Sequence, residues 1–225
     1  MESCRGFKEL ESPLWVRKMK TLFRVMDADG DGFMSLEDNQ APPKRMTEAF
    51  NLSKEEADAV LEYTRRVGWI EFVNAGTEPP KGHRVSEKTF LENMARAVNS
   101  QDVAVPLAES HVVMFDLKEQ GFITKEEYLK VFRSLAVPEE LAVQQFEMID
   151  SDNDGRITVE DYTKVFRFFF TDLEHTDDPR NNIFGPLIPK ELESPLWVRK
   201  MKTLFRVMDT DGDGFMSLED NQAPP

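Results

Sequence analysis

The sequence contains a single cysteine, three histidines and no long apolar run among its 225 residues. Cys4 has no partner in the chain, so an internal disulfide framework of the kind found in small secreted domains is excluded. No apolar stretch approaches the ~20 residues that cross a bilayer. His83, His111 and His175 are isolated, and neither a metalloprotease motif, a P-loop nor a nucleophile motif is present. We therefore expect neither a membrane-spanning protein nor an enzyme.

Basic residues are also in the minority. Twenty-eight Lys and Arg against 42 Asp and Glu give a formal net charge of −14. Phosphate backbones and anionic lipid surfaces repel a chain of this sign, so metal cations are expected as partners and nucleic acid and membranes are not. Residues 1–4 lack the apolar stretch of a signal peptide, and position 2 is not the glycine that myristoylation requires. We expect a cytoplasmic protein.

Helical periodicity dominates the rest of the chain, and strand signals are scarce. Apolar residues recur at helical spacing from Leu14 to Met26. Further amphipathic helices are predicted over residues 55–67, 87–98, 139–149 and 162–170. Ser53 is predicted to cap the first of these, with Glu56 completing a capping box. Seventeen Phe and eleven Met indicate a soft core between interlocking helices, so the predicted fold is all-α.

Three twelve-residue segments between these helices share one acidic pattern, at residues 27–38, 150–161 and 209–220. Aspartates stand at positions 1, 3, 5 and 12, and a glycine at position 6 permits the positive φ of a sharp turn. Position 7 offers a backbone carbonyl and position 9 a hydroxyl. The pattern predicts oxygen-lined cation sites. The predicted ligands are Asp27, Asp29, Asp31, Phe33, Ser35 and Asp38, then Asp150, Asp152, Asp154, Arg156, Thr158 and Asp161, and finally Asp209, Asp211, Asp213, Phe215, Ser217 and Asp220.

An acidic run is commonly just a solvated surface, but the charge here is concentrated in the loops. The three loops carry fifteen acidic side chains and one arginine, a net charge of −14, so the remainder of the chain is neutral. Five carboxylates within twelve residues repel one another unless a cation lies between them. Ser35 and Thr158 have a second, compatible role, because each precedes an aspartate by three residues and is predicted to start a helix.

Two further loops are degenerate. Residues 116–127 keep a glycine and Glu127 at position 12, but Lys118 places a cation at a ligand position. This loop is predicted to be structural, with weak calcium binding left open. Residues 78–89 have lost nearly every ligand and are predicted to be empty. Short backbone bridges are predicted to pair the loops, Met34 with Val85 and Ile123 with Ile157.

A long internal repeat closes the sequence. Residues 8–43 return as residues 190–225, an offset of 182, and differ only where Ala28 corresponds to Thr210. Ancient duplication does not leave such near-identity, so the second copy is either recent or an artefact of the gene model. The predicted domains are a module over residues 1–189 and a partial repeat over 190–225. The repeat lacks an exit helix, so we expect it to bind metal weakly alone and to compete with the first copy, within one chain or by self-association.

The helix–loop–helix spacing and the loop pattern resemble the EF-hand superfamily. Four units near residues 14–45, 60–98, 103–134 and 138–170, followed by a C-terminal segment 171–189, resemble the invertebrate sarcoplasmic calcium-binding proteins. Aspartate at position 12 and the apolar Ile183, Phe184 and Leu187, which would fold back over the core, support the resemblance. It implies a compact four-EF-hand module. Two departures are Asn39, where an apolar anchor is usual, and Pro42-Pro43, which are expected to interrupt the exit helix.

The resemblance implies a cytosolic Ca²⁺/Mg²⁺ buffer. Aspartate at position 12 is one methylene shorter than glutamate, which favours the six-oxygen shell that Mg²⁺ prefers. A calcium sensor that opens an apolar groove for a target protein is the second interpretation. A calcium-linked carrier of a small, luciferin-type ligand is the third. Its cavity would be lined by Trp15, Tyr63, Trp69, His111, Tyr128 and Tyr162.

Overall fold

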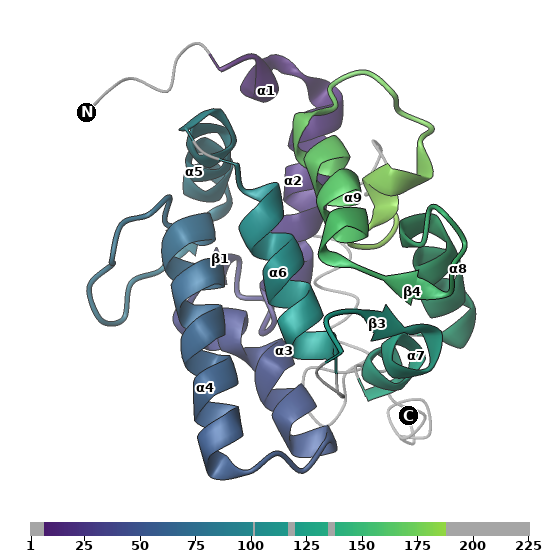
Figure 1. Cartoon of the computed structure of the whole chain (residues 1–225). Helices are drawn as coiled ribbons and strands as arrows, with labels where there is room; N and C mark the ends of the chain where they lie inside the picture. Colours follow the sequence, from purple (N-terminus) through teal and green to yellow (C-terminus); the bar gives the residue numbers. More distant parts are fainter. Residues whose placement is uncertain (1–6, 101, 117–119, 135–137, 188–225) are drawn as a thin grey trace, which may run out of the picture. The chain divides into compact units, whose positions relative to one another are not determined.

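A computed structural model describes residues 7–100, 102–116, 120–134 and 138–187, which fold as an all-helical assembly of helix–loop–helix units (Figure 1). The chain divides into two compact parts, Met1–Pro186 and Leu187–Pro225. The first part is described here. The predicted repeat, with its ligands from Asp209 to Asp220, lies outside the described residues.

Helix pairs follow one another along the described chain as the periodicity predicts. Four units can be traced in sequence order. The first contains α1 (Lys8–Glu11), α2 (Pro13–Met26) and α3 (Leu36–Ala49); the second contains α4 (Lys54–Thr64), the π-helix η1 (Arg65–Val73) and α5 (Glu87–Ser100); the third contains α6 (Ala104–Phe115) and α7 (Lys125–Ser134); and the fourth contains α8 (Glu139–Ile149) and α9 (Val159–Thr171), with the 3₁₀ helix η2 (Pro179–Asn182) beyond it.

Two antiparallel bridges join the loops in pairs. Strand β1 (Phe33–Met34) pairs with β2 (Val85–Ser86), and β3 (Ile123–Thr124) pairs with β4 (Arg156–Ile157). Met34 lies opposite Val85 and Ile123 opposite Ile157, which confirms both predicted bridges. All four of these side chains are fully buried. Each bridge therefore fixes an acidic loop against the loop of its neighbouring unit.

Side-chain caps start the helices where the sequence predicts them. The capping boxes of Ser35 with Asp38, of Ser53 with Glu56 and of Thr158 with Asp161 are all present. In each box the first side chain accepts from the backbone N–H of the third helical residue, and that residue's carboxylate returns to the cap. The first loop and the fourth loop therefore end at fixed helix starts.

The expectation that Pro42-Pro43 interrupt the exit helix is wrong, because α3 continues through both prolines to Ala49. Proline fixes φ near the helical value, so its backbone conformation is compatible with a helix. Its cost is the missing N–H donor and the clash of its ring with the preceding turn. The capping box at Ser35 holds the start of α3, and buried Met46 and Thr47 hold its second half. The predicted helix over 55–67 also differs, since it ends at Thr64 and the π-helix η1 carries on to Val73.

The segment after α9 folds back onto the core, as predicted for Ile183 and Phe184. Ile183 is buried, and the Phe184 ring lies 5.9 Å from that of Phe166 and 5.1 Å from that of Phe169. This segment therefore covers α9 rather than extending into solvent (Figure 1).

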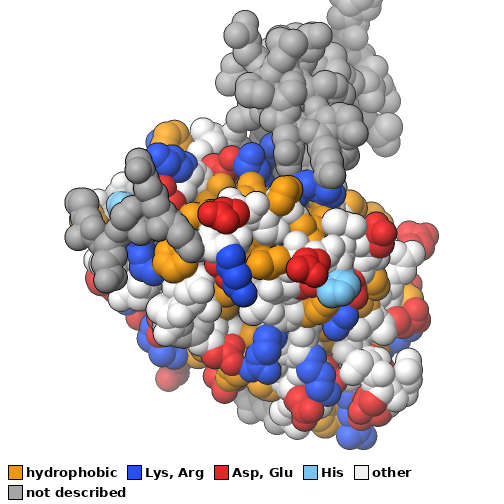
Figure 2. Space-filling model, turned by 90° about the horizontal axis from the view of Figure 1, so that it is seen from above, with side chains coloured by type: hydrophobic (Ala, Val, Ile, Leu, Met, Phe, Trp, Pro, Cys, Tyr) orange, Lys and Arg blue, Asp and Glu red, His pale blue; other side chains and the backbone are white. Residues whose placement is uncertain are grey.

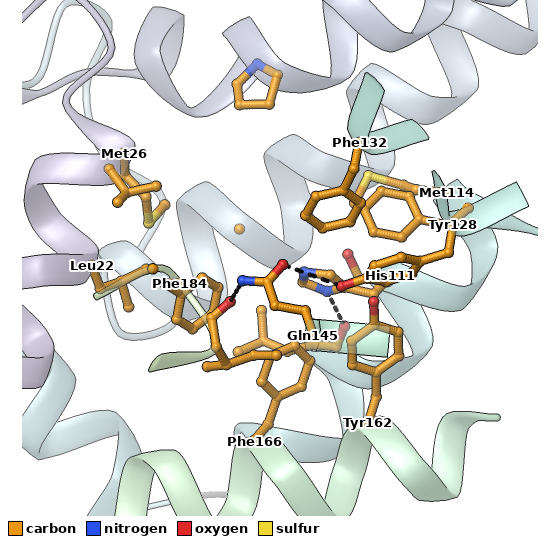
Figure 3. A pocket seen from close by; sticks show the side chains of 18 of the residues that line it. Leu22, Met26, His111, Met114, Tyr128, Phe132, Gln145, Tyr162, Phe166 and Phe184 are labelled. Atoms are coloured by element: carbon orange, nitrogen blue, oxygen red, sulfur yellow. Dashed lines mark hydrogen bonds between the residues drawn. The ribbon is translucent and has the colours of Figure 1, made fainter. Parts of the chain in front are cut away.

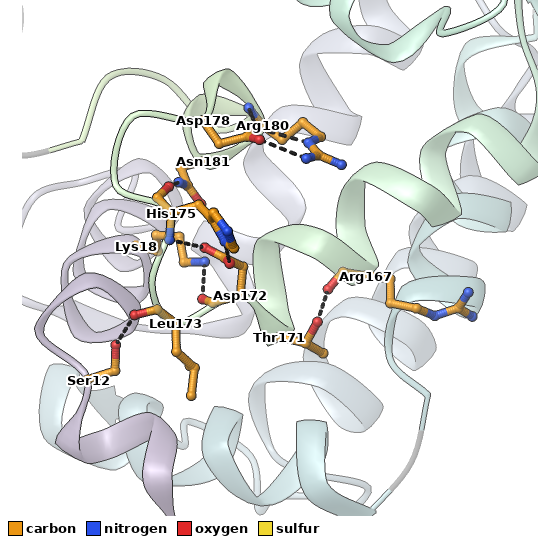
Figure 4. Close-up of polar contacts among 10 residues, drawn as sticks. All are labelled: Ser12, Lys18, Arg167, Thr171, Asp172, Leu173, His175, Asp178, Arg180 and Asn181. Atoms are coloured by element: carbon orange, nitrogen blue, oxygen red, sulfur yellow. Dashed lines mark hydrogen bonds and ion pairs between the residues drawn. The ribbon is translucent and has the colours of Figure 1, made fainter.

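The N-terminal half of α2 binds the end of α9 through three donors. Trp15 Nε1 donates to the Phe170 carbonyl at 2.8 Å, Lys18 Nζ to the Asp172 carbonyl at 2.7 Å and Ser12 Oγ to the Leu173 carbonyl at 3.0 Å. Figure 4 shows the Ser12 and Lys18 contacts. These bonds satisfy carbonyls that the end of a helix leaves without partners. The first unit and the last unit are joined in this way.

No helix in the described part of the chain is long and apolar enough to cross a membrane. On the face in Figure 2, acidic and basic side chains are interspersed among apolar ones.

Candidate metal centres and an internal cavity

The first acidic loop brings three predicted ligands together at the junction of α2 and α3. Carboxylate oxygens of Asp27, Asp29 and Asp38 all lie within 4.8 Å of one another. Asp27 follows the last residue of α2, and Asp38 stands in the first turn of α3. Asp38 Oδ2 accepts from the backbone N–H of Ser35 at 2.8 Å and from its hydroxyl at 2.5 Å. Ser35 therefore fixes the carboxylate that closes the loop.

The electrostatics of this loop fit a cation. Burial, and then the neighbouring carboxylates of Asp38 and Asp29, raise the pKa of Asp27 above its usual value. Asp27 Oδ1 is buried without a hydrogen-bond partner, while Oδ2 accepts from the Gly32 N–H at 2.9 Å. A bound cation would give that oxygen a ligand bond and offset the repulsion between the carboxylates.

Asp31, predicted to share this site, lies outside the cluster. Its carboxylate pairs with Arg84, which precedes β2 in the second unit. The Arg84 guanidinium also lies 4.4 Å from the centre of the Phe33 ring. The predicted empty loop thus supplies a cation that competes for one ligand of the first loop.

The fourth loop clusters Asp150, Asp152 and Asp154, whose carboxylate oxygens also lie within 4.8 Å of one another. Asp150 accepts from the N–H groups of Asp154 at 3.1 Å and Gly155 at 3.0 Å. Burial raises the pKa of Asp150, and the carboxylates of Asp152 and Asp154 add to this effect.

Asp161, the predicted position-12 ligand, is absent from the fourth-loop cluster. Its Oδ2 is held by Thr158, through the backbone N–H at 3.1 Å and the hydroxyl at 2.6 Å. Lys164 Nζ lies 3.8 Å from Asp161 Oδ1. The fourth loop therefore has its first three acids assembled, while its closing carboxylate contacts both Thr158 and Lys164.

The third loop is described only in part, because residues 117–119 are outside the described ranges. Glu127 is 3% exposed, and its Oε2 accepts from the Thr124 hydroxyl at 2.6 Å. Its position-12 carboxylate is therefore held in the same way as Asp38 and Asp161.

A cavity of about 780 Å³ lies among the four helix–loop–helix units. Figure 3 shows its lining of apolar and aromatic side chains, among them Leu22, Met26, Met114, Phe132, Phe166 and Phe184. Of the aromatic residues proposed for a ligand cavity, His111, Tyr128 and Tyr162 line it; Trp15, Tyr63 and Trp69 do not. Asp38 and Asn39 of α3 line it as well, so α3 borders both the first metal loop and the cavity.

A few polar groups converge inside this apolar space. His111 Nδ1 lies 2.7 Å from the Leu107 carbonyl, and the His111 ring packs 4.9 Å from Phe166. Burial lowers the pKa of His111 to about 4, so the imidazole is neutral at physiological pH. Tyr128 donates to Gln145 Oε1 at 3.4 Å, and Gln145 Nε2 donates to a backbone carbonyl. The cavity thus combines apolar walls with a few polar side chains.

Comparison with known proteins explains the loops. An EF-hand domain pair model matches residues 107–167, and an EF-hand model matches residues 19–38 and 201–220. The sarcoplasmic calcium-binding protein of Perinereis vancaurica tetradentata is 34% identical over 181 residues, which cover 79% of this chain and all of that protein. The chain belongs to the sarcoplasmic calcium-binding protein family. It is a calcium-binding EF-hand protein, and its relatives in this family are not enzymes.

Two solved structures of similar fold are named for the small molecules that those proteins bind. Okadaic acid binding protein 2.1 is 32% identical, with a TM-score of 0.64 over 79% of this chain and 98% of that chain. The Ca-loaded apo form of coelenterazine-binding protein from Renilla muelleri is 22% identical, with a TM-score of 0.62 over 81% and 99%. The second likeness concerns the fold alone.

Proposed function

We propose that this protein is a cytoplasmic buffer of Ca²⁺ and Mg²⁺. The supporting observation is Asp38, which Ser35 holds beside Asp27 and Asp29 as a preformed part of the first loop. A rigid aspartate at position 12 offers one oxygen readily and two with difficulty, so six-oxygen coordination is favoured. Magnesium accepts only that geometry, whereas calcium tolerates it. Sites of this kind hold Mg²⁺ at rest and exchange it for Ca²⁺.

Calorimetric Ca²⁺ titration with and without millimolar Mg²⁺ tests the buffer. Mg²⁺ should weaken the apparent Ca²⁺ affinity of the two predicted sites, 27–38 and 150–161. Asp161→Glu lengthens the closing side chain, so it should restore bidentate coordination and raise the preference for Ca²⁺ in the fourth loop. The matched control is Glu160→Gln, one residue earlier in the same loop. Equal Ca²⁺/Mg²⁺ ratios in Asp161→Glu and the parent chain would show that position 12 does not set selectivity.

The cavity supports a second candidate function, the binding of a small amphipathic molecule. About 780 Å³ is within the range of small-molecule sites, and most of the lining is apolar. His111, Tyr128 and Gln145 supply hydrogen-bonding groups, so the ligand would be mainly apolar with a polar group directed to them. The name of okadaic acid binding protein 2.1, at 32% identity, supports such a use of the fold. Because α3 borders both sites, metal in the first loop would affect the cavity wall.

Titration with the fluorescent probe anilinonaphthalene sulfonate tests the cavity. Ser110 is buried in α6 and lines the cavity, while Val113 on the same helix is 60% exposed and does not. Ser110→Trp should fill part of the space and weaken probe binding at least tenfold. A tenfold loss of affinity corresponds to apolar contacts worth about 1.4 kcal/mol. Val113→Trp should bind the probe like the parent chain. If both variants bind the probe equally, it does not enter the cavity.

A further inference from the structure

Residues 190–225 carry the same side chains that residues 8–43 use for their contacts, with one exception. Helix α2 places Trp15, Met19, Leu22 and Phe23 in the core, each no more than 3% exposed. Their counterparts in the second copy are the same residue types. These counterparts are Trp197, Met201, Leu204 and Phe205.

The polar contacts of α2 are duplicated too. Ser12, Trp15 and Lys18 donate to the carbonyls at the end of α9. Their counterparts are Ser194, Trp197 and Lys200. The one difference between the copies falls at Ala28, whose side chain is exposed and whose backbone N–H bonds to Asp38 Oδ1 at 3.1 Å. A threonine there keeps that hydrogen bond and meets solvent.

The surface that receives α2 and β1, here called the seat, belongs entirely to residues outside the repeat. Phe90 of α5 packs against Phe23 with ring centres 5.6 Å apart, Val85 pairs with Met34, and the end of α9 accepts the three hydrogen bonds. The offset of 182 residues has a consequence for the whole chain. Residues 44–225 contain, in rotated order, one copy of every segment found in residues 8–189.

We propose that the seat accepts residues 190–225 of the same chain in exchange for residues 8–43, so that one sequence encodes two circularly permuted forms of one module. The exchange point falls after Pro43 in α3, which is continuous there but lacks the backbone N–H donors of Pro42 and Pro43. Little backbone bonding is lost by dividing the helix there.

The second copy can reach the seat from its own chain. The Phe169 ring lies 5.4 Å from Lys18 Nζ and 5.1 Å from the Phe184 ring, so one side chain of α9 contacts both α2 and the C-terminal segment. Ten residue-to-residue steps lead from Phe184 to Ser194, and in extended form they span roughly 33 Å, more than the roughly 21 Å length of α2. Tethering gives the own-chain segment a millimolar effective concentration, which a second molecule at micromolar concentration cannot match.

The contact between Phe23 and Phe90 provides the test, which uses the full chain loaded with Ca²⁺. Phe23 has a second copy and Phe90 does not. Phe90→Ala should lower the midpoint of thermal unfolding by about 10 °C or more. Phe23→Ala should lower it by about 3 °C or less, because Phe205 takes over, and Phe23→Ala with Phe205→Ala should match Phe90→Ala. An equally large fall for Phe23→Ala alone would overturn the proposal.

Two further measurements complete the test. Sedimentation of Phe23→Ala should show a monomer; a dimer would place a second molecule's segment in the seat and overturn the own-chain exchange. Should the alanine variants fail to fold, Phe23→Leu and Phe90→Leu give the same comparison with smaller shifts, and equal shifts for these two again overturn the proposal.

Discussion

At the scale of single residues, His111 is a titratable group that the core keeps neutral. Its ring lies 5.6 Å from Phe115, 5.2 Å from Tyr162 and 4.9 Å from Phe166. Burial lowers its pKa from 6.5 to about 4. Between these values the unfolded chain binds more protons than the folded chain, so stability falls as the pH falls from 6.5 towards 4.

His111→Phe should therefore remove part of the acid sensitivity of the protein. We expect the parent chain to lose about 2 kcal/mol more than the variant between pH 7 and pH 5, measured by urea unfolding with Ca²⁺ present. His175→Gln is the control. Asp172 raises the pKa of the exposed His175, so its contribution has the opposite sign and is lost as the pH rises. Parallel pH profiles for His111→Phe and the parent chain would contradict this account.

The acidic loops show how far single residues can be placed from sequence. Asp27, Asp29 and Asp38 converge as their spacing predicts, because a short loop with a fixed turn and a cap determines their positions locally. Asp31 does not join them, since Arg84 comes from a loop more than fifty residues away. A distant charge partner has no signature in the twelve-residue pattern.

At the scale of elements, α3 and η1 meet at Asn39 and Gly68. A Cβ atom on Gly68 of η1 would lie 2.6 Å from Asn39 Nδ2, so a larger residue there would require the Asn39 side chain to move. Asn39, the predicted departure from an apolar anchor, is 7% exposed, and its Oδ1 has no hydrogen-bond partner. A polar side chain thus fills the space where α3 meets the π-helix.

Gly68→Ala should destabilise the protein although alanine is the better helix former. The collision with Asn39 should outweigh the propensity gain of ~1 kcal/mol and leave a net loss of about 1–2 kcal/mol in the free energy of unfolding. Adding Asn39→Ala removes the colliding side chain, so the double variant should be more stable than Gly68→Ala alone. Strictly additive effects in this double-mutant cycle would show that the two residues do not interact.

Helix starts were predictable and the middle of the second unit was not. Ser35, Ser53 and Thr158 act through residues three positions away, which a sequence pattern contains. The π-helix and the passage of α3 through Pro42-Pro43 depend on packing between elements, which overrides local propensity.

At the scale of the whole molecule, the cavity is the feature that sequence reasoning located only in part, because three of the six aromatic residues proposed for it line it. Its lining comes from residues between Leu22 and Pro186, drawn from all four units and the C-terminal segment. The apolar residues concerned follow the same helical periodicity as residues of a filled core. Whether they enclose space depends on the sum of side-chain volumes across the module, which no local pattern records.

The carboxylates of the fourth loop repel one another without metal and bind the cation when it is present. The variant Asp152→Asn should change stability in opposite directions in these two states. Without metal the variant removes one charge from the cluster of Asp150, Asp152 and Asp154, and its amide oxygen can still accept from the Asp154 N–H. Its apo form should therefore unfold at a higher temperature than the parent chain in chelator, by an amount that shrinks as salt screens the repulsion. With saturating Ca²⁺ the order should reverse, because a tenfold weaker site contributes about 1.4 kcal/mol less to stability.

Asp177→Asn, which removes an equal charge outside the loops, should show no reversal. Thermal unfolding with and without metal measures both arms, and a variant less stable than the parent chain in both would mean that the carboxylate is needed for the loop's structure rather than for its cation.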